Sequence, residues 1–236
     1  MSQMKQQSES KNRTKRSKKG ANQEVKVLLG LGAIALIIIS TATLFFNRSH
    51  QGTVPLSAAD QDRLVREDSP SRGPTNALVT LVEFLDPECE SCRAAYSEVE
   101  QILDDYEGRI RYVVRYFSNH NNSVLAVIAT EAAGEQGKYW EMQEILFANQ
   151  PQWGERATPQ TELFISYAGE LGLDVERFTA SLQNPDYAAK AERDQQDAQA
   201  LGLRGTPTFF VNGQLVYGMN DDTLRTLIDQ TLAGDL

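Results

Sequence analysis

The sequence predicts an α/β domain whose strands are separated by a block of helices, preceded by one transmembrane helix. Three observations predict this architecture. An uncharged run of twenty residues occupies 27–46, two short apolar segments enclose an amphipathic stretch, and a hairpin signal follows a series of helical patterns. With 236 residues, of which 41% are hydrophobic, the chain can bury a core without disulfide bonds.

The charges are distributed unevenly along the chain. Residues 1–26 contain eight Lys or Arg and two Glu, so this segment carries +6 while the whole chain carries -9. The remainder therefore carries -15, which argues against nucleic-acid binding by the main body. We interpret residues 1–26 as a basic cytoplasmic tail that sets the topology of the chain.

The uncharged run at 27–46 is predicted to be a single transmembrane helix. At 1.5 Å per residue it spans about 30 Å, which is the thickness of the hydrocarbon core. The basic tail favours a cytoplasmic N-terminus, so we expect the rest of the chain outside the cell membrane. A cleaved signal peptide is the alternative, because residues 40–42 (Ser-Thr-Ala) resemble a cleavage site. The apolar run continues to Phe46, which favours an uncleaved anchor.

Residues 47–75 are predicted to be an extracytoplasmic linker, and the folded domain is assigned to 76–236. The linker mixes polar residues with Pro and Gly and lacks a sustained periodicity. Within the domain, the apolar, β-branched run at 78–85 is typical of a buried strand, and the amphipathic stretch at 89–106 of a helix. A second strand at 110–117 completes a parallel β-α-β unit with a right-handed crossover.

Helices and a hairpin follow this unit. Helical patterns cover 123–133, 138–147, 159–171, 175–182 and 185–201. The strands predicted at 208–211 and 214–217 are joined by Asn212-Gly213, the strongest short-range hairpin signal. A final helix is predicted from residue 221 to residue 232.

The two cysteines of the chain, Cys89 and Cys92, lie three positions apart where the first strand gives way to a helix. At a helix start, free backbone N–H groups and the helix dipole stabilise a thiolate at Cys89. Cys92 follows one turn later, where it can attack a mixed disulfide on Cys89. In an extracytoplasmic setting, the pair predicts thiol–disulfide exchange.

Two other uses of the cysteine pair are weaker. A structural disulfide that closes so short a loop adds little stability, because the stabilisation grows with loop length. A zinc site needs about four ligands, and the chain offers only His50 and His120 besides the cysteines. We therefore expect no metal and no cofactor. His120 is interpreted as a residue at a helix start, although it could line a groove near the dithiol.

Two further features agree with dithiol chemistry. Glu83 is the single acid of the first apolar strand, and a buried carboxylate below the dithiol could take the proton of Cys92. The alternative places Glu83 at a strand end in contact with water. Thr206-Pro207 directly precedes a strand, and a cis bond there would place the Thr206 backbone beside the dithiol, free to pair with an extended substrate.

The runs VEFLDPECESCRAAY and GTPTFFVNG resemble the DsbA-like thiol–disulfide oxidoreductases of the thioredoxin superfamily. The resemblance covers roughly residues 70–236. It implies a thioredoxin-like fold with a helical domain inserted at about 121–190. By position, it further implies the following roles: Cys89 is the nucleophile, Cys92 the resolving cysteine, Glu83 the buried acid and Pro207 the cis proline.

One departure from the family pattern concerns the redox potential. Strongly oxidising members have His directly before the second cysteine, whereas this chain has Ser91 there, after Glu90. Ser91 supplies no cation near the dithiol, and the nearby carboxylates of Glu88 and Glu90 favour the neutral thiol of Cys89. We therefore expect a potential between about -120 mV, the value for DsbA, and about -270 mV, the value for thioredoxin.

The predicted function is a membrane-anchored, extracytoplasmic thiol–disulfide oxidoreductase, acting as an oxidase. Its expected partners are cysteine-containing secreted or surface proteins and a membrane redox partner that resets the dithiol. A reductase or isomerase for a dedicated client, such as an extracytoplasmic metalloprotein under assembly, is the alternative enzyme. A membrane-tethered binding module that keeps the fold and uses the disulfide structurally is the alternative from another class.

Overall fold

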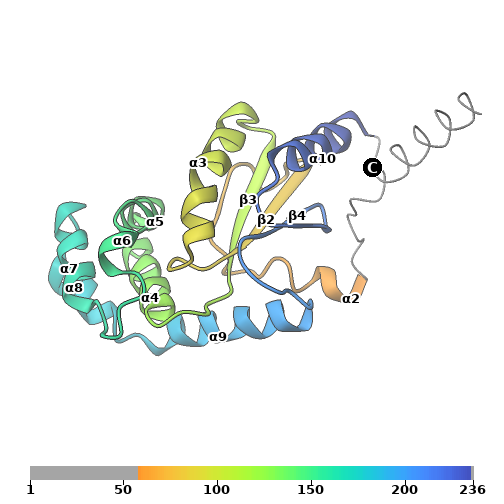
Figure 1. The fold of residues 1–236 in the computed structure, drawn as a ribbon. Coiled ribbons are helices and arrows are strands. Elements are labelled where there is room, and N and C mark those ends of the chain that lie inside the picture. The colour runs from red at the N-terminus through yellow and green to blue at the C-terminus, as the bar shows by residue number, and fades with distance from the viewer. Residues whose placement is uncertain (1–57, 235–236) are drawn as a thin grey trace, which may run out of the picture. The chain divides into compact units, whose positions relative to one another are not determined.

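A mixed five-stranded sheet lies at the centre of residues 58–234, the part of the chain that the computed structural model describes (Figure 1). The strand order is β1-β3-β2-β4-β5. The strands are β1 (Ser71–Arg72), β2 (Val79–Leu85), β3 (Ile110–Tyr116), β4 (Thr208–Val211) and β5 (Gln214–Tyr217). Strands β2 and β3 are parallel, and the other three neighbouring pairs are antiparallel.

The helices fall into two groups, those that pack against the sheet and those of the inserted segment at 123–181. The helices are α2 (Ala58–Gln61), α3 (Glu90–Asp105), α4 (Ser123–Gly134), α5 (Tyr139–Ala148), α6 (Gln150–Trp153), α7 (Thr161–Glu170), α8 (Val175–Ser181), α9 (Pro185–Ala200) and α10 (Asp221–Ala233). The predicted β-α-β unit, the helical block and the terminal hairpin with its helix are therefore all present.

Helices α3 and α10 cover one face of the sheet (Figure 1). Alternate residues of β2, such as Leu81 and Leu85, point to this face, as expected for a pleated strand. The buried residues of α3 are Cys92, Ala95, Val99 and Ile102, which recur every three or four positions and so form one apolar stripe. This packing fixes the start of α3 against the end of β2.

Helix α9 covers the opposite face of the sheet. Val82 and Phe84 of β2 point to this side and pack in one cluster with Ala198 of α9 and with Leu64. The sheet is therefore enclosed between two helical layers, which explains why the sequence of β2 is a nearly continuous apolar run.

Helices α4 to α8 form a separate group with its own core, at the left of Figure 1. The core includes Met142, Trp153, Phe164 and Phe178. Trp153 is fully buried, and its indole N–H donates to the carbonyl of Leu146 at 2.9 Å. The expected helical insertion is confirmed, and α9 leads the chain from it back to the sheet.

The folded domain begins before residue 76, so the predicted linker boundary is wrong. Strand β1 pairs with β3 through Ser71 and Val113, and Leu64 is buried among the residues below the sheet. A strand of two residues has no periodicity to reveal it, and for that reason the segment resembled a linker. A smaller correction applies to α7, which begins at Thr161 rather than at residue 159.

Several predictions fall outside the described residues. They are the basic tail at 1–26, the transmembrane helix at 27–46 and the first part of the linker. Within residues 58–234, no helix combines the length and the apolar character needed to cross a membrane.

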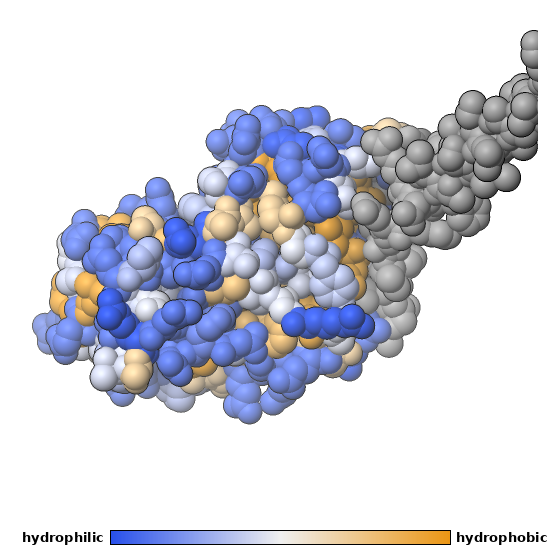
Figure 2. All heavy atoms as spheres, in the orientation of Figure 1, coloured by the Kyte–Doolittle hydropathy of each residue, from blue (hydrophilic) through white to orange (hydrophobic). Residues whose placement is uncertain are grey.

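The face of the domain in Figure 2 is largely hydrophilic, with apolar side chains in separate patches. Large apolar residues that remain exposed are Leu78, Val124, Val175 and Tyr217. They come from different parts of the chain, as scattered surface residues do, and need no special explanation.

Candidate active site

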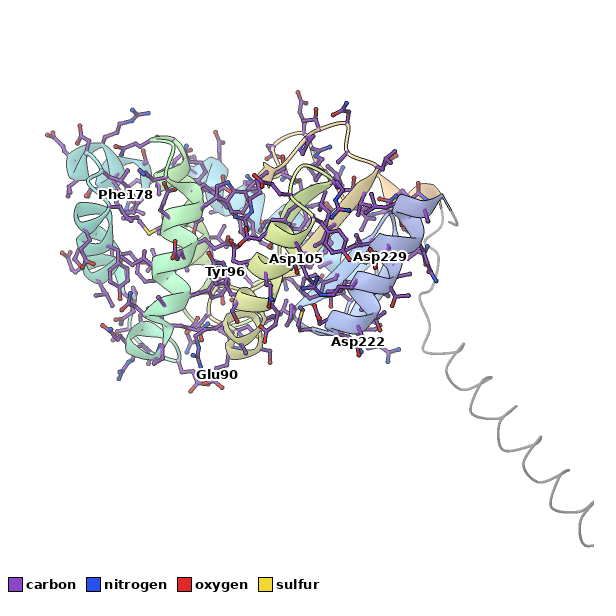
Figure 3. The ribbon with its side chains drawn as sticks, turned by 90° about the horizontal axis from the view of Figure 1, so that it is seen from above. Glu90, Tyr96, Asp105, Phe178, Asp222 and Asp229 are labelled. Atoms are coloured by element: carbon purple, nitrogen blue, oxygen red, sulfur yellow. The ribbon has the colours of Figure 1, made fainter. Side chains whose placement is uncertain are left out.

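The two cysteines lie where β2 leads into α3. Cys89 is the N-cap residue of α3 and is partly exposed, whereas Cys92 is only 1% exposed. Both are free thiols in this structure. Glu90, the first residue of α3, is exposed at the end of the helix, and Tyr96 lies on the side that faces the inserted helices (Figure 3). The start of α3 thus presents one sulfur to the surface and buries the other.

The environment of Cys89 favours its thiolate. A hydrogen bond with Cys92 is the main cause that lowers the pKa of Cys89 to about 5, and hydrogen bonds from the side chain of Thr206 and from the backbone N–H groups of Ser91 and Cys92 contribute. Burial opposes them. Cys89 is therefore largely ionised at neutral pH, as a nucleophilic cysteine needs to be.

The environment of Cys92 has the opposite effect. Burial raises the pKa of this thiol well above its usual value, and the hydrogen bond with Cys89 and the charge of Glu83 raise it further. The backbone N–H of Asp86 points at the Cys92 sulfur, at 3.5 Å. The pKa values of the two thiols thus shift in opposite directions, so that Cys89 favours the thiolate and Cys92 the neutral thiol.

Glu83 is buried in β2 on the face that packs against α3, with 4% of its surface exposed. The alternative of a carboxylate in contact with water is therefore wrong. Burial raises the pKa of Glu83 to about 7, although a hydrogen bond from the hydroxyl of Tyr112 lowers it. A carboxyl group with this pKa can give or take a proton near neutral pH.

The loop before β4 meets the dithiol from the other side. The peptide bond between Thr206 and Pro207 is cis, so this expectation is confirmed. As a thiol, Cys89 donates to the carbonyl oxygen of Thr206 at 3.5 Å. The structure thus brings Thr206 next to Cys89, whereas the roles of these residues in binding and catalysis remain predictions.

Gln150 of α6 is a contact that the sequence did not reveal. Its side chain is 3% exposed, and its amide donates to the carbonyls of Pro87 at 2.9 Å and of Cys89 at 3.0 Å. Arg93 of α3 donates to the amide oxygen of Gln150 at 3.0 Å. The helical insertion therefore holds the backbone on both sides of Glu88. A lone Gln in a short helix gives no sequence signal for this role.

Two buried acids flank the same loop. Asp86 is fully buried, and Glu88 is 2% exposed. The carboxylate of Glu88 accepts hydrogen bonds from the backbone of Asn122 at 2.5 Å and of Glu155 at 2.7 Å, both in the helical insertion. From the sequence, the carboxylates of Glu88 and Glu90 are expected to raise the pKa of Cys89 against the effect of the helix start. The pKa of Cys89 is nevertheless lowered to about 5, because hydrogen bonds to its sulfur dominate.

His120 also contacts the loop. Its Nδ1 lies 2.7 Å from a carboxylate oxygen of Asp86, the residue that directly follows β2. It therefore does more than begin a helix. Within residues 58–234, no group of three or more His, Cys, Asp or Glu residues is arranged to hold a metal ion.

Comparison with known families agrees with this geometry. A family model described as thioredoxin matches residues 66–230. The chain belongs to the thioredoxin family. Among solved structures of the thioredoxin fold, a thioredoxin-like oxidoreductase from Silicibacter pomeroyi is 30% identical, with a TM-score of 0.64 over 73% of this chain and 98% of that one. BdbD from Bacillus subtilis is 25% identical, with a TM-score of 0.65, and the match covers 77% of this chain and 98% of BdbD.

Curated relatives of this thioredoxin-family chain carry a different name. A Na(+)/H(+) antiporter NhaA from Herminiimonas arsenicoxydans is 40% identical over 66% of this chain, and NhaA 1 from Salinispora arenicola is 38% identical over 69%. The match covers only 24% of each antiporter. The chain thus spans about a quarter of the length of these relatives. Most of each antiporter has no counterpart in the matched segment.

Proposed function

We propose that this chain is a thiol–disulfide oxidoreductase that faces the outside of the cell membrane and oxidises cysteine-containing secreted or surface proteins. The observation that carries the proposal is the opposite change in acidity of two thiols one helical turn apart. The pKa of Cys89 is lowered to about 5, while that of Cys92 is raised well above its usual value. A structural disulfide does not need this asymmetry, whereas a nucleophile and a resolving thiol do.

The first step begins from the Cys89–Cys92 disulfide. A client thiolate attacks the sulfur of Cys89, because Cys92 is almost completely buried. A mixed disulfide forms between the client and Cys89, the bond between the two cysteines breaks, and Cys92 leaves with the electron pair. Its high pKa means that Cys92 takes up a proton, which the buried Glu83 can supply.

The second step releases the oxidised client. A second client thiolate attacks the client sulfur of the mixed disulfide, and Cys89 leaves as a thiolate. Its low pKa makes Cys89 a good leaving group. The client has lost two electrons and two protons. The dithiol has gained both electrons and one proton on Cys92, and the other proton goes to solvent because Cys89 remains a thiolate. A membrane redox partner that accepts two electrons from the dithiol would restore the disulfide.

The low pKa of Cys89 also favours an oxidase over the alternatives. A stabilised thiolate stabilises the reduced form of the pair, so the disulfide form becomes the stronger oxidant. A reductase or an isomerase would run the same steps with the pair kept reduced. A binding module would need neither thiol to react. Ion transport, the activity in the name of the curated relatives, is not part of this proposal, since the match covers 24% of those proteins.

Oxidative refolding of a reduced, multi-disulfide protein tests the proposal. The oxidised full-length chain in detergent should accelerate the recovery of native disulfides, and Cys89→Ser should abolish this activity. Cys92→Ser, incubated instead with the disulfide-containing native form of that protein, should accumulate mixed disulfides on Cys89, because no thiol remains to resolve them. Ser97→Ala, a change at an exposed position of α3, should leave the refolding activity intact. Reduction of insulin without refolding activity would favour a reductase. Inactivity in both assays, with a wild-type fold, would favour the binding module.

A further inference from the structure

The imidazole of His120 is held by a hydrogen bond on one side and exposed to solvent on the other. It follows β3, and its Nδ1 lies 2.7 Å from Oδ2 of Asp86, while its backbone N–H donates to the hydroxyl of Ser123 at 3.1 Å. The side chain of His120 is 40% exposed. Because a carboxylate can only accept, Nδ1 carries the proton of this bond, and Nε2 is the nitrogen that titrates.

Asp86 connects this imidazole to the dithiol. Its carboxylate is fully buried and also accepts from the hydroxyl of Ser123 at 2.6 Å and from the backbone of Glu88 at 2.9 Å. The backbone N–H of the same residue faces the Cys92 sulfur at 3.5 Å. A carboxylate with so many donors cannot rotate freely, so His120 is held at a fixed position relative to the cysteine pair.

The charged groups that raise the pKa of His120 are anionic. They are Asp86 from the loop after β2, Glu88 from the same loop and Cys89 from the start of α3. Burial lowers the pKa of His120, but the hydrogen bond with Asp86 and the charges of Asp86, Cys89 and Glu88 together raise it above its usual value of 6.5. On the α9 side, neutral Gln195 contacts the adjacent Asn119. His120 is thus a cation at weakly acid pH.

We propose that His120, held by Asp86, is a positioning residue for the dithiol whose imidazolium stabilises the Cys89 thiolate. From the loop after β3, it supplies the cation that the Cys89-Glu-Ser-Cys92 motif lacks. Coupling between two charges is reciprocal, so the thiolate that raises the pKa of His120 is itself stabilised by the imidazolium. This inference rests on the proposed dithiol chemistry but makes its own prediction about the redox potential.

The direction of the effect follows from the charges. The reduced pair contains the Cys89 thiolate, whereas the oxidised pair is neutral. A proton on His120 therefore binds more tightly to the reduced protein, and the pair becomes more oxidising as the pH falls through the pKa of His120. Because the ring is partly exposed and screened by solvent, we expect about a threefold effect on the redox equilibrium, which corresponds to about 14 mV.

Titration of His120 by NMR tests the coupling without any substitution at the site. The chain contains two histidines, and His50→Gln identifies the signal of His120. The full chain in detergent should show a His120 pKa that is higher in the reduced than in the oxidised protein by about half a unit, the equivalent of the threefold effect. High ionic strength should reduce the difference. Equal pKa values in the two redox states would overturn the proposal.

Two substitutions separate charge from structure. His120→Gln should shift the equilibrium with glutathione about threefold toward the disulfide near pH 6, whereas His120→Lys should match the wild type there and lose the pH dependence above it. Equal shifts in both variants would show a structural role and overturn the proposal. These measurements need no client, so a chain that equilibrates with glutathione but fails in refolding would count against the proposed oxidase and leave the His120 coupling standing.

Discussion

Tyr112 of β3 donates its hydroxyl hydrogen to the carboxylate of Glu83 on the adjacent parallel strand β2. Both side chains are buried, and the guanidinium of Arg72 lies over the Tyr112 ring, 5.4 Å from its centroid. Burial raises the pKa of Glu83 to about 7, and the bond from Tyr112 keeps it from rising further. This pair of strands therefore places a group that titrates near neutral pH beneath the dithiol.

The first prediction concerns stability. Because the pKa of Glu83 rises from 4.5 to about 7 on folding, the neutral carboxyl is favoured in the native state. The resulting stability is fully present below about pH 4.5 and is lost as the pH rises to about 7. The free energy of unfolding of Glu83→Gln should therefore exceed that of the wild type by up to about 3 kcal/mol at pH ~8, and the two should be equal at pH ~4.

Urea unfolding of both proteins at the two pH values measures this difference. Glu98→Gln, at an exposed position of α3, is the matched control and should leave the pH dependence unchanged. A Glu83→Gln effect of the same size at both pH values would contradict the assignment of a raised pKa.

The second prediction concerns the role of Glu83 in proton transfer. Glu83→Gln should slow the attack of Cys92 on the mixed disulfide by about 10²-fold, while the formation of the Cys89 adduct stays nearly unchanged. Tyr112→Phe should retain the base but move the midpoint of the pH–rate profile upward, because it removes the bond that lowers the pKa of Glu83. Stopped-flow measurements from about pH 6 to 9 would detect both effects. A resolution rate that Glu83→Gln leaves unchanged would exclude Glu83 from the mechanism.

The third prediction concerns Gln150. Gln150→Leu leaves the carbonyls of Pro87 and Cys89 without their buried donor, so the variant should lose about 2–3 kcal/mol of unfolding free energy. Gln152→Leu, at an exposed position of the same helix, should lose much less. Denaturant unfolding measures the difference. Equal losses in the two variants would mean that Gln150 does not hold the loop.

The fourth prediction concerns the redox potential. The pKa of Cys89, about 5, lies between about 3.5 for DsbA and about 7 for thioredoxin, so the potential should lie between about -120 and -270 mV. Ser91→His should make the pair more oxidising, and Glu90→Gln should do so only weakly because Glu90 is exposed. Equilibration with glutathione buffers measures each value. A wild-type potential at or above about -120 mV would contradict this account.

The fifth prediction concerns the membrane anchor. The uncharged run at 27–46, behind a basic tail, should keep the full-length protein in the membrane pellet after alkaline carbonate extraction. A chain that lacks residues 1–46 should appear in the supernatant. A soluble form of the full-length gene product that starts near residue 43 would indicate a cleaved signal peptide instead.

The parts of the fold that were predictable have short-range signals. The β-branched run in β2 and the Asn212-Gly213 turn specify local backbone geometry, and both elements are observed where they were expected. The position of Cys89 at the start of α3 follows from the same local pattern. The cis bond before Pro207 required the family resemblance, because most such bonds are trans.

The contacts that could not be predicted join residues far apart in the chain. Asp86 and Glu88 are acids in a loop, which are usually exposed, yet each is buried by donors more than thirty positions away. Gln150 reaches Cys89 across 61 positions. Neither periodicity nor spacing encodes such pairs, because they arise only when the helical insertion packs against the loop.

The bond from the Cys89 thiol to the Thr206 carbonyl has a consequence for the timing of client binding. A thiol can donate to that carbonyl, but a thiolate has no hydrogen to give. When Cys89 ionises, the carbonyl becomes available to the backbone N–H of an extended peptide. Acidification below the pKa of Cys89, about 5, returns the hydrogen to sulfur and occupies the acceptor again. The Cys89–Cys92 disulfide, which receives the client in the proposed oxidation, likewise has no hydrogen on Cys89, so only the reduced and protonated protein closes this acceptor to an extended peptide.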